Sequence, residues 1–487
     1  MGNHVGRSAD GTGKKSATMT NNTNNIKSMS RTPSGTDIEH NFVTHFRPVD
    51  KLSKILSERN HHDNDGHGVS EDVFIKYLFP HYSEFASRLY GYLHKSSKAT
   101  TKHLGTSAFK QQIEKLLGIM NDRTVLDIYV KMYSNTMDES GEVTPQGLRD
   151  LLMISYRLAM DNESTTCPYV HKTIHAAVTS CFHGKEILSV SFISNWLWQH
   201  CPRVVYGVHR YVVHVLTTAY RNGQALLSTE ELQPHIGPVT PVLEKVLSFE
   251  QADNMLPLSQ VWLLSTSLPF CFIQTEESPS KESSAVFSSK LSSYPCPSHW
   301  TLLYTSDQHG AGANRLLHHI LGYRGPTIVF IRGENGNEDG VTYCICSSIE
   351  WRESHLYWGD EDCVIIELQP SYRIVEKGPK LLYLNTSIRG YPHGLRAGKD
   401  PRNPYINVDQ SFASVSFGGA PHRIKSIEAW GCGDRKSRER QLEIKKWQVK
   451  EAERQRVVKL SAADWLDHPD RYLLELAGRP SYVNAEK

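Results

Sequence analysis

The sequence changes from helix-forming to strand-forming near Trp300, and this change constrains the fold more than any other feature. Before it, apolar residues recur at helical spacing between segments of Gly, Pro, Asn and Ser. After it come short segments rich in β-branched and aromatic residues, at 301–305, 327–332, 341–348, 362–368, 381–385 and 424–430. One helical stretch, 313–321, separates the first two. Short strands with little helix between them favour an antiparallel β-sandwich over a parallel sheet, so the sequence predicts an α+β chain.

Composition divides the chain into four parts. Residues 1–39 contain no Phe, Trp, Tyr or Leu, and so few apolar groups cannot offset the entropy of ordering, so we expect a disordered tail. Residues 40–235 are expected to form a helical region. Residues 240–433 are expected to form the β-rich domain, with a Ser-rich loop at 276–297. Residues 436–480 begin with a run of good helix formers, which predicts a charged helix followed by a short terminal helix.

Charge and cysteine content exclude several classes of protein. Lys and Arg number 54 against 52 Asp and Glu, a net charge of +2, so a globally basic nucleic-acid-binding protein is excluded. Nine cysteines in 487 residues are too few for a disulfide scaffold. The sequence has neither the apolar core of a secretory signal nor an apolar run of about 18 residues that could span a bilayer. We expect a cytoplasmic, reducing location.

The N-terminus has features of a lipidation signal. Removal of Met1 would expose Gly2 for N-myristoylation, although Gly6 occupies the position where the motif usually has Ser or Thr. One myristoyl chain gives only marginal membrane association, with a constant of about 10⁴ M⁻¹, so stable attachment needs a second contact. The alternative is a disordered tail without an acyl chain.

Two segments resemble EF-hand calcium loops. In the first, Asp63 and Asp65 occupy ligand positions one and three, and Gly68 occupies the position of the sharp turn. The twelfth position, which must supply a bidentate carboxylate, is Phe74. The pattern therefore predicts the helical architecture of an EF-hand without strong calcium binding.

The second segment, 136–147, is a similar partial match. Asp138 occupies the third position, but the first is Thr136 and the twelfth is Gly147. Asp63, Asp65 and Asp138 are thus only weak calcium candidates, because neither loop has the terminal carboxylate. We expect no other metal and no cofactor.

Sequence signatures of enzymes are missing. The chain has no P-loop, no dinucleotide-binding glycine motif, no Gly-x-Ser-x-Gly elbow and no His-Glu-x-x-His. We therefore predict a non-enzymatic protein. An enzyme that acts on peroxides or another small substrate would need a reactive thiol, and the candidates are Cys344, Cys346, Cys363 and Cys432.

The segment 299–332, HWTLLYTSDQHGAGANRLLHHILGYRGPTIVFIR, resembles the TLDc domain family. It contains a strand, the sequence SDQHG at 306–310, a helix, and a Gly-Pro pair before the next strand. Later landmarks, LLYLN at 381–385 and IEAWG at 427–431, agree, and 254–269 resembles the helical entry to the domain. The segment 396–419 departs from the family pattern, so contacts that relatives make through it are not transferred.

The resemblance implies a β-sandwich with flanking helices and no established catalytic residues. The order of parts, from the Met-Gly start to the charged C-terminal helix, resembles a branch of the family that is myristoylated at the residue equivalent to Gly2. Such relatives lie on the cytosolic face of lysosomes and act in TOR signalling. TLDc proteins more widely bind the vacuolar proton ATPase, and several are linked to oxidative-stress resistance.

The sequence therefore predicts an adaptor or regulator peripheral to the lysosomal membrane, with the vacuolar proton ATPase and TOR components as partners. We expect partner contacts in the β-rich domain and the C-terminal helix, at His309, Gly310, Trp430, Gly431, Leu442, Trp447 and Val449. Two alternatives are a calcium-sensing EF-hand adaptor and an oxidative-stress protein with a weak enzymatic activity.

Overall fold

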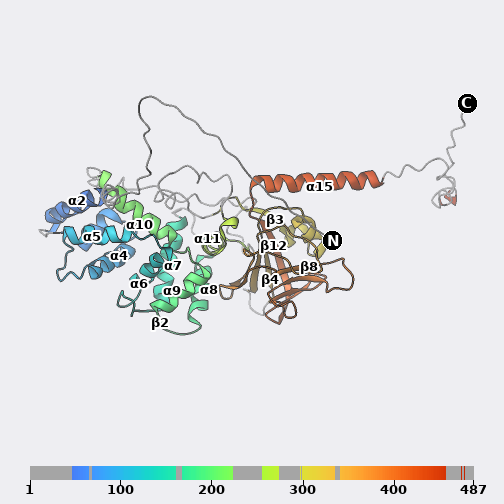
Figure 1. The fold of residues 1–487 in the computed structure, drawn as a ribbon, viewed down its shortest axis with the longest axis horizontal. Helices are drawn as coiled ribbons and strands as arrows, with labels where there is room; N and C mark the ends of the chain where they lie inside the picture. The colour runs from blue at the N-terminus through green and yellow to red at the C-terminus, as the bar shows by residue number, and fades with distance from the viewer. Residues whose placement is uncertain are drawn as a thin grey trace, which may run out of the picture. The chain divides into compact units, whose positions relative to one another are not determined.

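The computed structural model describes residues 47–64, 68–160, 167–222, 255–273, 297, 299–334, 340–456, 473 and 476–477. All of them except Arg47 belong to one compact unit, Pro48–Lys487. Helices form the N-terminal part of the described chain and strands form most of the C-terminal part, so the predicted α+β class is confirmed (Figure 1). The predicted tail 1–39 and nearly all of the Ser-rich loop 276–297 lie outside the described residues.

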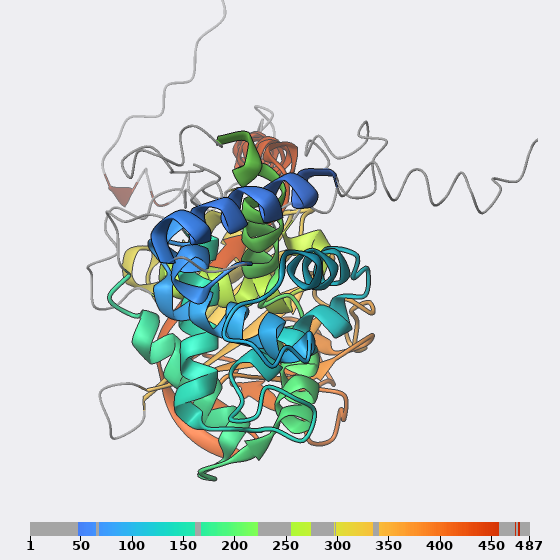
Figure 2. The same cartoon turned by 90° about the vertical axis from the view of Figure 1, so that its left-hand side faces the viewer.

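The N-terminal helices gather into one bundle, blue to green in Figure 2. Each is amphipathic; in α4, for example, Phe85, Leu89 and Leu93 recur every fourth residue and are buried. The helices are α2 (Arg47–Asn64), α3 (Glu71–Leu78), α4 (Ser83–Ser96), α5 (Thr106–Leu117), α6 (Asp122–Met132), α7 (Pro145–Met160), α8 (Val170–Phe182), α9 (Val190–His200) and α10 (Tyr206–Thr218), with a 3₁₀ turn at Ala219–Asn222.

The first four helices form two helix–loop–helix units joined by a backbone bridge between Val69 and Leu104. Val69 N donates to Leu104 O at 2.8 Å, and Leu104 N donates to Val69 O at 3.0 Å. The Tyr90 hydroxyl also donates to Val69 O, at 2.7 Å. Gly68 has a φ of +99°, and a Cβ there would lie 2.5 Å from Leu104 O, so a larger residue does not fit. The bridge thus holds the two loops together.

The next four helices repeat this arrangement. The two-residue strand β1 (Glu142–Val143) pairs antiparallel with β2 (Leu188–Ser189), which joins the α6–α7 loop to the α8–α9 loop. Both predicted EF-hand-like loops therefore lie in helix–loop–helix units, and each has a partner unit that the sequence analysis missed. The partner loops, 97–105 and 183–187, contain no Asp and so carry no calcium-loop pattern.

The β-rich part is a ten-stranded sheet in the order β7-β6-β5-β4-β12-β11-β10-β9-β8, with β3 also paired to β12. All of the strand pairs in this sheet are antiparallel. Its strands are β3 (Thr301–Thr305), β4 (Thr327–Gly333), β5 (Val341–Ser347), β6 (Val364–Gln369), β7 (Arg373–Lys377), β8 (Leu382–Asn385), β9 (Gly394–Ala397), β10 (Ile406–Val408), β11 (Ser414–Phe417) and β12 (Ala420–Gly431).

The sheet folds into two layers because β12 belongs to both. Its first half pairs with β11, its second half pairs with β3, and β4 runs along its other edge. Side chains from both layers meet in one buried core, which includes Ile331 of β4, Ile345 of β5, Leu384 of β8 and Val408 of β10. This arrangement is the predicted antiparallel sandwich.

The opposite face of β4–β6 is buried as well. It lies against α11 (Leu258–Ser267) and the 3₁₀ turn Phe270–Phe272: the Tyr372 and Ser267 hydroxyls lie 2.6 Å apart, and Trp300 Nε1 donates to Phe272 O at 2.7 Å. Strands buried on both faces read as unbroken apolar runs, which is why 327–331 and 343–346 carried a strong strand signal.

Each of the six predicted strand segments contains a strand, and the predicted helix 313–321 corresponds to α14 (Ala313–Ile320). Four strands of the large sheet were missed, β7, β9, β10 and β11, as were the two-residue strands β1 and β2. Strands β9, β10 and β11 are only three or four residues long and lie among Gly, Pro and Asp residues. Such segments carry too little periodicity to be recognised.

The edge strand β7 is covered by α9. Ile374 N donates to His200 Nδ1 at 3.0 Å, so one amide of the sheet edge is satisfied by a side chain of the helical region. Burial, together with Arg373 and Lys377, lowers the pKa of His200 to about 4. The ring is therefore neutral at pH 7, as its role as an acceptor requires.

Acidification should release this contact. The folded-state pKa of His200 lies below the unfolded value of about 6.5, so its stabilisation is complete above that value and is lost as pH falls toward about 4. We expect unfolding titrations to show the wild type losing roughly 1–2 kcal/mol more than His200→Gln between pH 7 and pH 4, because solvent screens the partly exposed ring and reduces the effect. Equal losses in both proteins would contradict this assignment.

Arg203 closes the C-terminal end of α11. Its buried guanidinium donates to Ser265 O at 2.9 Å and to Leu268 O, and it lies 4.7 Å from the centroid of the Phe270 ring. The last carbonyls of a helix lack intrahelical partners and carry partial negative charge, so a cation there satisfies them. Arg203 thus links the α9–α10 connection to the helix that covers the sheet.

Replacing Arg203 should destabilise the whole unit. Arg203→Met leaves the Ser265 and Leu268 carbonyls without these donors, and we expect unfolding in urea to show a loss of about 2–4 kcal/mol. Arg203→Lys keeps the charge but loses the forked geometry. Its free energy of unfolding should therefore lie between those of the wild type and Arg203→Met. If Arg203→Met is as stable as the wild type, the cost of burying the guanidinium equals the stabilisation that its hydrogen bonds supply.

Candidate functional site

The loop between α6 and α7 is the better described of the two predicted calcium loops. Asp138 Oδ1 accepts hydrogen bonds from Ser140 N at 3.0 Å, Ser140 Oγ at 2.6 Å and Thr136 Oγ1 at 2.9 Å. Positions one, three and five of the loop therefore converge, as they would around a metal ion. Here they converge on the carboxylate of the loop itself.

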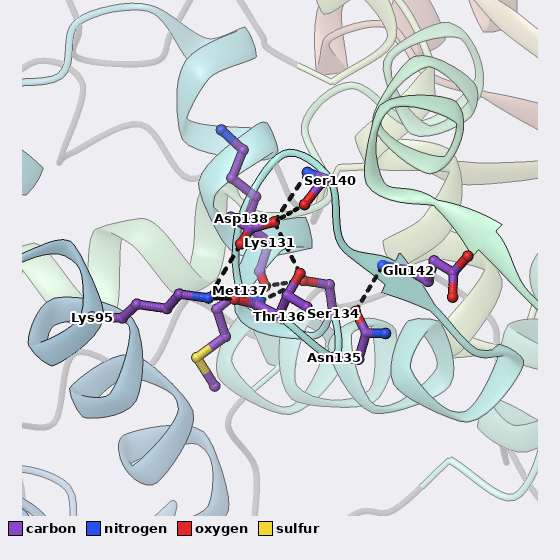
Figure 3. Close-up of polar contacts among 9 residues, drawn as sticks. All are labelled: Lys95, Lys131, Ser134, Asn135, Thr136, Met137, Asp138, Ser140 and Glu142. Carbon is purple, nitrogen blue, oxygen red and sulfur yellow. Dashed lines mark hydrogen bonds and ion pairs between the residues drawn. The ribbon is translucent and has the colours of Figure 1, made fainter.

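A lysine from the neighbouring pair of units enters this loop. Lys95, near the C-terminus of α4, places Nζ 3.2 Å from Asp138 Oδ2 and also donates to Thr136 O (Figure 3). The hydroxyl hydrogen bonds and the ammonium lower the pKa of Asp138 to about 2, so the carboxylate is ionised at pH 7. Lys95 was missed in the sequence because it lies 43 positions away, with no local pattern connecting the two.

The residues of this loop do not fit a calcium ion. Calcium loops need a bidentate carboxylate at position twelve, and that position is Gly147, where a Cβ would already approach Tyr133 O at 2.9 Å. The first loop is similar: Ser70 caps α3, and the buried Val73 and Phe74 follow. Asp63 lies in the last turn of α2, and Asp65 lies outside the described residues.

The same conclusion holds for the rest of the described chain, in which no group of three or more His, Cys, Asp or Glu is placed to hold a metal.

The ion pair between Lys95 and Asp138 should stabilise the loop, and Asp138 should not bind calcium. We expect Lys95→Met and Asp138→Asn to speed hydrogen exchange of the Ser140 and Glu142 amides, while leaving global stability almost unchanged, because the pair is exposed and screened by solvent. Calorimetry of the wild type with calcium should show no heat of binding. A calcium signal abolished by Asp138→Asn would overturn this interpretation.

The second candidate region is α15 (Arg435–Arg456), the predicted charged helix, which projects in red at the top of Figure 1. Asp434 caps its start by accepting from Ser437 N at 2.9 Å. The buried Gln441 side chain donates to His319 O at 2.7 Å and Leu321 O at 3.3 Å, at the end of α14, and Ile444 lies beside Gly322. The first half of α15 is thus anchored to the sandwich.

The second half of α15 leaves the domain. From residue 446 to residue 450 every side chain is exposed, and the predicted partner-binding residues Trp447 and Val449 are 64% and 57% exposed. Leu442, also exposed, lies earlier on the helix. Nine basic and four acidic residues make the helix positive overall. The end of the predicted helix, 457–459, lies outside the described residues.

The other predicted partner-binding residues are less accessible. Trp430 is buried and donates to Glu428 Oε2 at 3.1 Å, and Gly431 is buried against the Tyr323 ring. These two residues support β12 and offer no surface to a partner in this structure, because their neighbours fill the space around them.

His309 and Gly310 are half-buried at the end of the short helix α13 (Ser306–His309). His309 Nδ1 accepts from Thr305 N at 3.1 Å, and Gly310 O accepts from the Tyr304 hydroxyl at 2.9 Å. His309 lies 4.1 Å, ring to ring, from His319. Burial, His309 and Lys445 together lower the pKa of His319 to about 4, so the His319 ring is neutral at pH 7. Partner binding by His309 and Gly310 stays a prediction.

The four candidate thiols are buried. Cys344 Sγ lies 3.8 Å from Cys346 Sγ, and burial raises the pKa of Cys346, Cys363 and Cys432. A protonated, inaccessible thiol is a poor nucleophile, so this arrangement does not support a thiol-based reaction.

None of the helices in the described part of the chain combines the length and apolar character of a bilayer-spanning segment. The predicted lipidation site Gly2 lies outside the described residues.

Residues 280–433 match the family model of the TLDc domain, which confirms the resemblance seen in the sequence. The chain is 24% identical over 153 residues to "MTOR-associated protein MEAK7" of Xenopus laevis, which covers 28% of this chain and 32% of that protein. The protein of the same name from Gallus gallus is 28% identical over 158 residues, with the same shares.

A fungal relative, "Restriction of telomere capping protein 5" of Lachancea thermotolerans, is 32% identical over 165 residues, or 28% of this chain and 29% of that protein. In every case the match spans about a third of the relative or less.

Proposed function

We propose that this chain is a non-enzymatic adaptor that regulates TOR signalling from the cytosolic face of lysosomes, by docking on a membrane-bound complex. The proposed binding partners are the vacuolar proton ATPase and TOR components. Support for the TOR link comes from the TLDc match and from the animal relatives whose name is "MTOR-associated protein". The observation that carries the docking proposal is the exposed outer half of α15.

The outer half of α15 has the character of a docking element. The side chains from residue 446 to residue 450 are all exposed, so the apolar groups among them gain free energy when a partner removes them from water. Trp447 and Val449 lie two positions apart and point to different sides of the helix, so a groove that wraps around these turns would cover most of their exposed apolar surface. Tryptophan is enriched among residues that dominate binding energy. The surplus of basic residues fits a groove with an acidic rim.

Attachment to the lysosome combines two weak contacts in this proposal. An acyl chain on Gly2 gives an association constant of about 10⁴ M⁻¹, and the α15 contact supplies the rest. Two linked contacts reinforce each other because the second forms at a high effective concentration.

The non-enzymatic part of the proposal has separate support. Neither the buried thiols nor the loop around Asp138 offers a nucleophile, a base or a metal centre to a substrate. The name of the fungal relatives concerns telomere capping, and nothing in the described residues points to nucleic acid.

The docking proposal is tested by sedimentation of the purified full chain with lysosomal membranes. Trp447→Ser combined with Val449→Ser should weaken membrane binding about tenfold or more, because both apolar contacts are lost. Gln448→Ser, between them on the same exposed turns, is the matched control and should bind like the wild type. Unchanged binding of the double variant would remove α15 from the interface.

Gly2→Ala provides a second arm of the same assay. Loss of the acyl chain should also reduce membrane binding, and combination with the α15 variant should abolish it. If Gly2→Ala sediments like the wild type, lipid attachment is wrong while protein docking stands.

A further inference from the structure

A second apolar surface lies at one edge of the sandwich, beside β8. The segment 354–358, from the connection between β5 and β6, runs along this strand. Ser354 N donates to Leu384 O at 2.9 Å, and Trp358 and Leu382 exchange two backbone hydrogen bonds of 2.7 and 2.8 Å. These contacts close the edge of the sheet against further strand pairing.

The neighbouring loop, 386–393, is fastened to this segment. The Glu353 carboxylate accepts from Thr386 N at 3.0 Å, from Ser387 Oγ at 2.7 Å and from Thr386 Oγ1. Asn385, the last residue of β8, donates through Nδ2 to two carbonyls of the loop, Ile388 O at 3.0 Å and Pro392 O at 3.1 Å. A surface held by this many internal hydrogen bonds loses little conformational entropy when it binds.

Apolar side chains are displayed outward at this rigid site. Leu356 lies midway between the two points at which its segment pairs with β8, and it is 65% exposed. Tyr391 is 46% exposed, and its ring lies 5.1 Å from that of His355, centroid to centroid. We name His355, Leu356 and Tyr391 the β8 tip. Exposed apolar groups on a pre-organised surface are typical of protein contact sites.

The charge around the β8 tip is positive. Arg352 and Arg389 are exposed there. Three carboxylates nearby are already engaged: Glu353 by the hydroxyls and the amide described above, Glu350 by Arg324 at 3.6 Å, and Asp400, which acts on Tyr357, by Arg402 N at 2.9 Å. The acidic run 360–362 lies at the far end of the β5–β6 connection, where Asp360 accepts from Ser348. A partner surface that complements the tip is therefore acidic.

We propose that the β8 tip binds an acidic segment of a partner protein that inserts one aromatic or aliphatic side chain between Leu356 and Tyr391. The tip is a second docking surface, besides α15. This inference rests on the proposed function only for the identity of the partner, which we take to be a protein of the same membrane complex.

Binding to short synthetic peptides tests the β8 tip without membranes. The probes carry a central Phe flanked by Glu on both sides, and the matched peptides replace Glu by Lys or Phe by Ala. The full chain should bind the Glu–Phe peptide about tenfold or more tightly than either matched peptide, with affinity falling as salt rises. Equal binding of all three peptides would overturn the proposal.

The variants locate the binding. Leu356→Ser with Tyr391→Ser should reduce affinity for the Glu–Phe peptide at least about tenfold, and Arg389→Glu should reduce it and weaken its salt dependence. Phe192→Ser, which removes an exposed aromatic side chain from α9, is the matched control and should bind normally. Thermal unfolding checks that the variants fold. A tip variant that folds and binds like the wild type refutes the proposal.

Lysosomal sedimentation separates this inference from the proposed function. If the wild type binds the Glu–Phe peptide but not the membranes, the tip proposal stands and the lysosomal assignment fails. If the membranes are bound equally by the wild type and the tip variant, and no peptide preference is seen, α15 docking stands and the tip proposal fails.

Discussion

The rest of the structure depends on the pairing of β12 with strands of both layers of the sandwich. The first half of β12 pairs with β11 and its second half with β3, so one strand holds both layers of the sandwich together. Just after it, Cys432 N donates to Pro326 O and Gly433 N donates to the Tyr323 hydroxyl. The end of the strand is therefore fixed, and α15 starts from a defined point with a defined direction.

The helical region is also held together by contacts between residues that are far apart in the sequence. Its loops are joined in pairs by short backbone bridges, and the Lys95 ammonium contacts Asp138 from the neighbouring pair of units. An architecture that elsewhere responds to calcium is here held by groups of the protein itself. The contacts of His200 with β7 and of Arg203 with α11 then join this region to the sandwich. These contacts fix the helical region against the sandwich.

The sequence predicted features whose signal is local and missed those that depend on distant contacts. Strands such as β4 and β5 are buried on both faces and read as apolar runs, whereas β9 and β10 are short segments between Gly and Pro. Trp447 and Val449 could be found because an apolar residue is conspicuous on a charged helix. Lys95 and Leu356 could not, because one lysine and one leucine in polar segments have no pattern before folding brings their neighbours together.

The stiffness of α15 has a mechanical consequence. The 11 residues from 446 to 456 extend about 16 Å beyond the last anchored turn, at about 1.5 Å per residue. A flexible tail of that length would let the sandwich rotate freely around its attachment. A continuous helix instead resists bending and twisting. A complex that binds its outer turns therefore also sets the orientation of the sandwich.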